Sequence, residues 1–456
     1  MHPKRATPSQ YDEEYFKRYV DQHQVEDISI PALYKPHTIT LLLVTIFALT
    51  FFVYSRDFNQ SLEKNLFDGA IFMIIVFLLI STMILPNGLF IRPHPVIWRL
   101  TLGASYVYLL ILIGTSFLTL KQAKSIMYYI APDLTGLESA QILNKSYGVN
   151  CNTLTFERIW SDVDIFVIAH FFGWVVKTLL LRHYAILWVQ SINWEITELA
   201  FSHLMPNLNE CWWDSIFFDI IICNGLGIYV GWILCKWLEM KEYKWESITK
   251  MTSTKAKLKR AVLQFTPQSW TLTRWIEGDS SLRRAVMVSF LIVIWQIVEL
   301  NSFLLKHIFV VKPSHFLTLS RLAFITLASA PSIRQYYQLT SNPHCRRIGS
   351  QLWVFLAILM VELLVCIKLG SQMFEKTIII NIFYWLTWLV ISSFIMVYMC
   401  LWAMKDTSPK EEKNTSDDER TAAEIFKEES KYCALCNRQL STTSNEEIDT
   451  NDKKND

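Results

Sequence analysis

The sequence predicts an all-α polytopic membrane protein with about ten transmembrane helices and with both termini in the cytosol. Three observations lead to this fold class. Of the 456 residues, 52% are hydrophobic and only 18% are charged, which is too apolar for an ordinary soluble protein of this length. Apolar stretches long enough to cross a bilayer recur along the chain. The basic residues are concentrated in particular connections between these stretches.

Transmembrane helices are expected wherever about 20 consecutive residues are predominantly apolar. Residues 1–36 are polar and form a predicted cytosolic tail, and residues 37–404 form the predicted membrane domain. Some stretches contain charged residues, so about eight to eleven spans fit the pattern. The expected spans are residues 38–55, 67–86, 97–119, 163–181, 184–204, 215–238, 286–309, 315–333, 351–370 and 377–403.

The orientation of these spans follows from the distribution of Lys and Arg, which favour the cytosolic side. Residues 236–285 contain eleven Lys and Arg, whereas residues 183–235 contain none. The basic segment is therefore expected to be a cytosolic loop. Counting spans outward from it places both termini in the cytosol and the loop at residues 205–214 on the lumenal side.

The polar tail and the cysteines complete the description of the chain. Residues 405–456 are net acidic and without apolar periodicity, so they are expected to be disordered. Lys453-Lys454 resembles a dilysine retrieval signal of the endoplasmic reticulum.

The nine cysteines match no disulfide framework and are interpreted mostly as small apolar residues, apart from the isolated pair Cys433 and Cys436. The net charge of +2 excludes a general nucleic-acid partner.

The acidic residues around the fifth and sixth spans point to a functional site. No Lys or Arg lies within residues 184–235 to neutralise the five carboxylates there, and a charge inside a bilayer costs about 2.5–3.5 kcal/mol. Protons, a cationic substrate, Lys177 from the neighbouring span or a bound metal ion would balance them. Oxygen ligands favour Ca²⁺, with Mg²⁺ or Mn²⁺ behind it. The candidate metal ligands are Glu195, Glu198, Glu210, Asp214 and Asp219.

Helical spacing places several of these side chains together. Glu195 and Glu198 are three residues apart and share a helix face. His170 and Lys177 lie on one side of the preceding span, at a spacing of two turns. By the predicted topology, the carboxylates lie in the lumenal half of the membrane. His170 is therefore a candidate general base or nucleophile beside an acidic cluster.

Several motifs resemble those of the eukaryotic base-exchange phosphatidylserine synthases, over about residues 30–403. The most specific are Arg92-Pro-His-Pro95, His170-Phe-Phe-Gly-Trp174, Trp194-Glu-Ile-Thr-Glu198, the run from Pro206 to Asp214, and the run from Asp219 to Gly225. The resemblance implies a multi-pass enzyme of the endoplasmic reticulum, enriched at mitochondria-associated membranes. It implies that L-serine replaces the headgroup of phosphatidylethanolamine or phosphatidylcholine in a Ca²⁺-dependent reaction without ATP, and that the enzyme forms homodimers.

The resemblance also implies roles for individual residues. Residues important in the family match His170, Glu195, Glu198, Asn207, Glu210, Asp214, Asp219 and Asn224. We expect His170, Glu195, Glu198 and Asp219 to be catalytic, and Asn207, Asn224 and Lys177 to bind substrate. Positions linked in the family to inhibition by the product match Arg92, Arg260, Gln264 and Arg334, all on the expected cytosolic side.

Two alternatives remain open from the residues alone, and a third, the use of a CDP-activated lipid, is disfavoured. Buried acids and a histidine also suit a cation-coupled transporter, which would move its substrate rather than modify it. A lipid scramblase is a weaker alternative, because its groove would not require five acids. Synthases that use a CDP-activated lipid carry a D-G-x₂-A-R signature followed by further aspartates, of which only Asp68-Gly69-Ala70 is present.

Overall fold

The computed structural model describes most of the membrane domain. The described residues are 38–55, 61–86, 88, 90, 94–135, 151–152, 165–209, 211–238, 253–254, 257, 275–276, 281–341, 347–375, 377–407, 432–433 and 438–439. Within them, seven helices are long and apolar enough to cross a membrane, and residues 42–54 and 170–181 form two shorter apolar helices. The predicted all-α polytopic membrane fold is confirmed.

Each expected span corresponds to a helix. The first three are α3 (Thr38–Tyr54), α4 (Leu62–Ile84) and α5 (Pro95–Ser116), followed by α9 (Ile165–Leu181), α10 (Tyr184–Phe201) and α11 (Leu226–Leu238). The last four are α13 (Ser281–Phe309), α14 (Phe316–Ser341), α15 (Ser350–Leu369) and α17 (Ile379–Thr407). The short elements are α6 (Leu120–Ile130), η2 (Pro132–Leu134), η3 (Pro206–Leu208), η4 (Asp214–Gly225), α16 (Ser371–Phe374) and the strands β1 (Tyr432–Cys433) and β2 (Arg438–Gln439).

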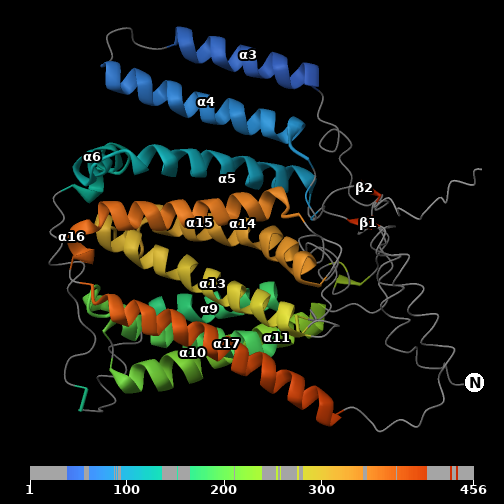
Figure 1. Ribbon diagram of the computed structural model, residues 1–456. Helices are drawn as coiled ribbons and strands as arrows, with labels where there is room; N and C mark the ends of the chain where they lie inside the picture. Colours follow the sequence, from blue (N-terminus) through green and yellow to red (C-terminus); the bar gives the residue numbers. More distant parts are fainter. Residues whose placement is uncertain are drawn as a thin grey trace, which may run out of the picture.

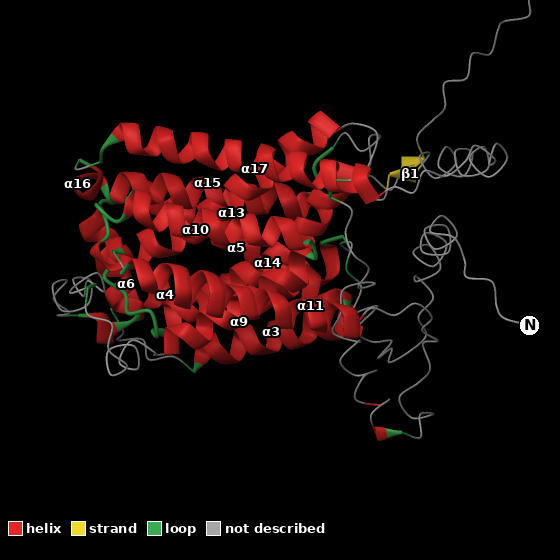
Figure 2. Cartoon of the chain, turned by 90° about the horizontal axis from the view of Figure 1, so that it is seen from below, coloured by secondary structure: helices red, strands yellow, loops and turns green. Residues whose placement is uncertain are grey.

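The long helices lie side by side in one bundle (Figures 1 and 2). At one edge α3 and α4 lead to α5, which packs against α15. At the other edge, α10 and α17 pack against α13, and α9 packs against α11. The start of α3 and the end of α17 lie at the same end of the bundle, opposite α6 and α16 (Figure 1). This arrangement is what two termini on the same side of a membrane require.

The basic segment at residues 236–285 and the acidic tail at residues 405–456 each contain a described part that makes structural contacts. In the basic segment, Trp275 is buried and donates a hydrogen bond from Nε1 to the Leu181 carbonyl, at 3.0 Å. This segment is therefore held against the end of α9 at that point. In the acidic tail, expected to be disordered, β1 pairs antiparallel with β2, so that Cys433 lies opposite Arg438. Cys436 lies outside the described residues.

Helix α14 is longer than its apolar stretch, which was expected to end at residue 333. The helix continues to Ser341 and includes Pro331. Its polar last turns are buried rather than solvated: the Tyr336 hydroxyl donates to the Met287 carbonyl at 2.6 Å, and Thr340 is also buried. Packing against α13 thus extends the helix beyond the region that hydropathy alone defines.

Two glycines allow α9 and α11 to approach closely. A Cβ atom on Gly227 would lie 2.7 Å from the Trp174 Cβ and 2.8 Å from the Phe171 carbonyl oxygen, and one on Gly231 would lie 2.6 Å from the Thr178 Cβ. Larger residues at either position would force the helices apart. The partner in this close approach is α9. The contact fixes the position of η4, which leads directly into α11.

Candidate functional site

The site is centred on His170, near the start of the described part of α9. Its Nδ1 atom lies 3.9 Å from Oδ1 of Asp219 on η4, and both side chains are largely buried. The second ring nitrogen, Nε2, is buried and has no hydrogen-bond partner within the described residues. Asn224 lies next to the ring and donates a hydrogen bond to the Ser191 hydroxyl at 2.7 Å. One ring nitrogen thus faces a carboxylate, while the other makes no hydrogen bond to the described residues.

Helix α10 contributes two carboxylates on one face, as its i, i+3 spacing predicts. Glu198 is 9% exposed and interacts electrostatically with Glu195 and with Asp219 from η4. Like charges in a low-dielectric environment repel one another strongly. The three carboxylates therefore favour a cation or protons in their midst.

The segment η4 has π-helical rather than α-helical geometry over its twelve residues. In a π-helix the backbone bonds link residues five apart and each turn holds more residues than in an α-helix, so residues at i, i+5 and i+10 fall within one broad face. Asp214, Asp219 and Asn224 have this spacing. In an α-helix, where residues i and i+4 align, the three side chains would point in different directions. The π-helical geometry therefore brings three predicted site residues toward one face.

The back of α10 is fixed by buried polar contacts. Thr197 accepts a hydrogen bond from the Trp385 indole at 2.8 Å and donates one to Gln296 at 2.9 Å. Gln296 also donates to the Gln190 side chain at 2.7 Å, and Asn193 accepts from the Trp388 indole at 3.1 Å. Buried hydrogen bonds of this kind resist rotation of a helix about its axis. The helix that carries Glu195 and Glu198 is thus locked to α13 and α17.

Lys177 does not extend toward the acids of α10 and η4. Its Nζ lies 2.8 Å from Oε1 of Glu299 on α13 and 3.9 Å from the centroid of the Trp174 ring. The Trp295 indole donates to the same Glu299 oxygen at 2.5 Å. The sequence contains the matching pairs Trp194/Glu198 and Trp295/Glu299, yet nothing in this repeat identified Glu299 as the partner of Lys177.

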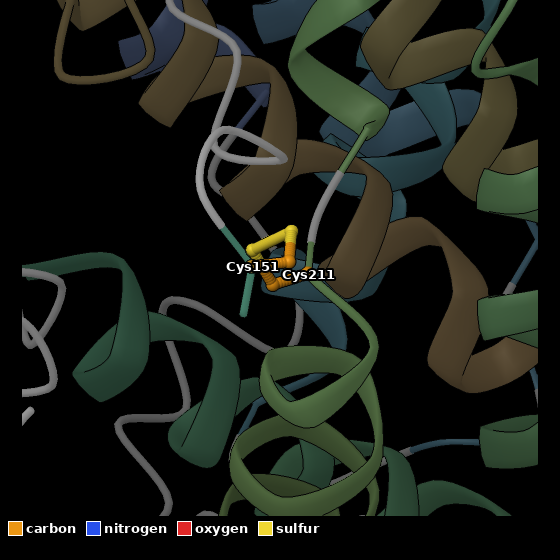
Figure 3. Close-up of a disulfide and its surroundings, with 2 residues drawn as sticks. All are labelled: Cys151 and Cys211. Carbon is orange, nitrogen blue, oxygen red and sulfur yellow. A yellow bond between two sulfur atoms is a disulfide. The ribbon is translucent and has the colours of Figure 1, made fainter. Parts of the chain in front are cut away.

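A disulfide, which the cysteine spacing did not predict, joins Cys151 to Cys211, with a Cα–Cα distance of 5.3 Å (Figure 3). It connects the segment before α9 to the residues immediately before η4. The interpretation of these two cysteines as small apolar residues is therefore wrong. Their partnership is invisible in the sequence because 60 positions separate them, and only the return of the chain through α9 and α10 brings them together. Disulfides persist in oxidising compartments such as the lumen of the endoplasmic reticulum.

Other predicted site residues lie apart from this centre or outside the described residues. The guanidinium of Arg334 on α14 lies 5.3 Å from the Tyr337 ring. Among the described residues, no three His, Cys, Asp or Glu side chains converge closely enough to form a ready metal site. Asn207 belongs to the short helix η3, but its side chain is not described. Glu210, Arg92, Arg260 and Gln264 are outside the described residues.

A second ionic cluster lies between α5, α13, α14 and α15. Glu362 is fully buried and accepts two hydrogen bonds from Arg321, at 2.9 and 2.7 Å. The Tyr108 hydroxyl donates to Glu362 at 2.5 Å, and Asn301 donates at 3.3 Å. Arg321 also donates to the Ser302 hydroxyl at 2.6 Å. The Glu362 carboxylate and the Arg321 guanidinium thus neutralise each other inside the bundle.

Comparisons with known proteins place the chain among lipid-synthesising enzymes. Residues 93–370 match the family model described as phosphatidyl serine synthase. The chain is 46% identical to phosphatidylserine synthase 1 of Danio rerio, covering 86% of this chain and 84% of that protein. It is 45% identical to phosphatidylserine synthase of Drosophila melanogaster, covering 84% and 76% respectively. It is also 36% identical to CDP-diacylglycerol–serine O-phosphatidyltransferase 2 of Oryza sativa, covering 82% and 90% respectively.

Proposed function

Because the chain belongs to the phosphatidylserine synthase family, we propose that it makes phosphatidylserine by base exchange, in which L-serine replaces the ethanolamine or choline headgroup of an existing phospholipid. The family confirms the expected phosphatidyltransferase in the membrane. The donor lipid, the metal and the residue roles belong to the proposal. The observation that carries it is the placement of His170, whose Nδ1 faces Asp219 and whose Nε2 has no hydrogen-bond partner among the described residues, while Asp219 in turn interacts with Glu198 of α10.

The chemistry follows from these groups. His170 accepts the proton of the serine hydroxyl while the serine oxygen attacks phosphorus. The bond from phosphorus to the departing headgroup oxygen breaks, and His170 returns the proton to that oxygen. Asp219 orients the ring and stabilises its protonated form. One phosphodiester replaces another, so no external energy source is needed. Attack by His170 itself, with a phosphatidyl-histidine intermediate, fits the same residue.

The acidic cluster suits a divalent cation. Its side chains offer only oxygen ligands, which favour Ca²⁺ over softer metals, with Mg²⁺ or Mn²⁺ next. Glu195, Glu198, Asp214 and Asp219 are the described residues that would hold the ion, together with Glu210. A bound divalent cation supplies positive charge beside the phosphodiester. Asn224 lies where it would orient serine or the headgroup, and Asn207 is the other amide assigned to substrate.

Base exchange is favoured over the use of a CDP-activated lipid, although the name of the rice relative contains CDP-diacylglycerol. The partial signature Asp68-Gly69-Ala70 lies on α4, which packs against α5 rather than against the helices of the site. A Cβ on Gly69 would meet no atom within 4 Å, so no close packing or phosphate cradle is built there. We infer that the lipid donor carries a simple headgroup.

The test is an exchange assay with the full-length protein in lipid nanodiscs, which offers labelled serine together with one donor at a time. Label should enter lipid with phosphatidylethanolamine, phosphatidylcholine or both, and should not enter with CDP-diacylglycerol. Chelation of divalent ions should abolish the reaction, and Ca²⁺ should restore it. Incorporation that required CDP-diacylglycerol would overturn base exchange, and activity without divalent ions would overturn the metal site.

Histidine variants test the assignment of the general base. His170→Ala should lower the exchange rate by about 100-fold or more, since positioned acid–base groups contribute roughly 10²–10⁴-fold. His203→Ala is the matched control, because His203 is exposed just after α10. It should retain the rate of the unmodified protein. A His170→Ala protein with normal exchange would remove the proposed role.

The competing transporter hypothesis predicts a different fate for serine. In sealed vesicles a cation-coupled transporter would accumulate free serine in the interior, whereas the enzyme would place the label in chloroform-soluble lipid. We also propose the endoplasmic reticulum membrane as the location, with both termini cytosolic. This location is compatible with the disulfide at the end of the bundle where the lumenal loops are predicted.

A further inference from the structure

The phosphodiester of a donor lipid is an anion. Lys177, the cation that the sequence predicts to bind substrate, already has an acidic partner. Lys177 is bound to Glu299 at 2.8 Å. A second lysine, Lys306, lies seven residues beyond Glu299 on α13. Glu299, Phe303 and Lys306 follow an i, i+4, i+7 spacing and so share one face of the helix. The face of α13 that holds Lys177 thus carries another cation closer to the predicted lumenal end.

Lys306 is linked to α10 by a chain of aromatic contacts. Its Nζ lies 3.9 Å from the centroid of the Phe303 ring. That ring packs against Trp194 of α10, with 5.3 Å between ring centroids. Trp194 lies one turn before Glu198 and interacts with its carboxylate. Lys306 is therefore a neighbour of the proposed site rather than part of a separate surface.

The charges around Lys306 leave it available for an anion. The charged groups that act on it most are Arg321 and Glu198. The guanidinium of Arg321 is already bound to Glu362 by two hydrogen bonds, so the neighbouring cation has its own carboxylate partner. Within the described part of the chain, Lys306 has no carboxylate within 4.0 Å and no hydrogen bond. A cation in this position contributes far more to anion binding than it would in bulk water.

We propose that Lys306 binds the phosphodiester of the phospholipid donor, an assignment that rests on the proposed exchange reaction. The Phe303 ring holds the ammonium from one side by a cation–π contact. The N–H groups that point away from the ring donate to a non-bridging phosphate oxygen. The phosphorus is then held between Lys306 on α13 and His170 on α9. The acids of α10 lie next to it. Lys306 is thus a substrate-binding residue that none of the predicted roles included.

The test separates binding of the lipid from binding of serine. Lys306→Gln is measured as full-length protein in nanodiscs, with donor lipid and serine varied in turn. The KM for the donor should rise by on the order of tenfold, because a charged hydrogen bond is lost. The KM for serine should change less than about twofold. Lys306→Arg should restore the donor KM to within about threefold, because it keeps the charge and the donors.

The matched control is Lys368→Gln, at the predicted lumenal end of α15. Lys368 is exposed and donates to the backbone carbonyls of Ser116 and Leu118, so neither KM should change. Binding of short-chain phosphatidylethanolamine without serine provides a readout that does not require turnover. Lys306→Gln should weaken that binding by the same factor.

Each result has a distinct meaning. If the unmodified protein exchanges serine but Lys306→Gln leaves both donor KM and donor binding unchanged, the assignment of Lys306 is overturned. A lower melting temperature and kcat with an unchanged donor KM would show a packing role and would also overturn it. If the unmodified protein exchanges serine into no donor lipid, the exchange reaction itself fails, independently of Lys306.

Discussion

At the scale of single residues, the sequence indicated which acids lie near one another but not the ionic partners of the neighbouring residues. The absence of Lys and Arg from residues 184–235 singled out Glu195, Glu198 and Asp219, and the structure brings these acids within electrostatic reach of one another. Lys177 was expected to balance them and instead binds Glu299. Local spacing predicts which residues share a helix face, whereas the helix opposite depends on packing between distant segments.

The Lys177–Glu299 ion pair should contribute strongly to stability because it is largely buried. Glu299→Gln leaves Lys177 without its carboxylate and should destabilise the protein by about 3 kcal/mol. The double variant Lys177→Met/Glu299→Gln removes both charges and should recover most of the loss. The measurement is thermal unfolding in detergent. A double variant less stable than Glu299→Gln would show that the pair does not act as one unit.

His183 should make stability depend on pH. It lies in the turn between α9 and α10, where Nδ1 accepts a hydrogen bond from the Ile186 N–H at 3.3 Å. Burial lowers the pKa of His183 from 6.5 to about 4. In the pH range between these values the unfolded chain binds a proton that the folded protein does not. Stability is therefore full above about pH 6.5 and falls as the pH drops toward 4.

The variant that tests this effect is His183→Asn, which retains a side-chain acceptor at the N-cap but does not titrate. The melting temperature of the variant should fall less than that of the unmodified protein between pH 6.5 and 4. Other groups, such as His94, titrate in both proteins, so the difference between the two curves isolates His183. Parallel curves would contradict the prediction.

At the scale of secondary-structure elements, the apolar stretches predicted where helices occur, and packing decided where they end. The expected span at residues 97–119 corresponds to α5 at Pro95–Ser116, and both ends of the helix lie within three residues of the expected ends. The span at residues 315–333 becomes the longer α14 because its polar last turns pack against α13. The π-helical geometry of η4 could not be predicted, because no pattern of residue types distinguishes it from an α-helix.

A register swap tests the geometry of η4. The wide turn of the π-helix brings position 219 round to the face of Asp214, whereas in an α-helix position 218 would lie on that face and position 219 would not. The double variant Phe218→Asp/Asp219→Phe keeps the composition and moves the carboxylate by one residue. Exchange activity should fall at least 100-fold while the melting temperature changes little. Activity retained at the normal level would indicate that η4 functions as an ordinary α-helix.

At the scale of the whole molecule, the fold class followed from composition and charge. The described helices confirm the polytopic fold, and the start of α3 and the end of α17 share one end of the bundle, as the count of spans required. The pairing of α5 with α15 and of α9 with α11 was not predictable. Only single residues, such as Gly227 and Gly231, gave any indication of close helix contacts, and they did not identify the partner helix.

The disulfide Cys151–Cys211 should stabilise the molecule as a whole because it closes a long loop. For a separation of 60 residues, the loss of chain entropy corresponds to about 4 kcal/mol. Cys151→Ser should therefore melt well below the unmodified protein, and a reductant should lower the melting temperature of the unmodified protein only. As a control, Cys400→Ser removes a free thiol and should leave the effect of the reductant intact. Equal sensitivity of Cys151→Ser and the unmodified protein to reductant would contradict the assignment.

The same bond also constrains how the protein is made. Cys151 precedes α9 and Cys211 follows α10, so the two thiols stand at the two open ends of one helical hairpin. The two sulfurs cannot meet until the α9–α10 hairpin has been threaded fully through the bilayer. Oxidation therefore records the completed insertion of the helices that carry His170, Glu195 and Glu198. In a chain whose α10 failed to insert, the two thiols would stay on opposite faces of the bilayer and this bond could not form.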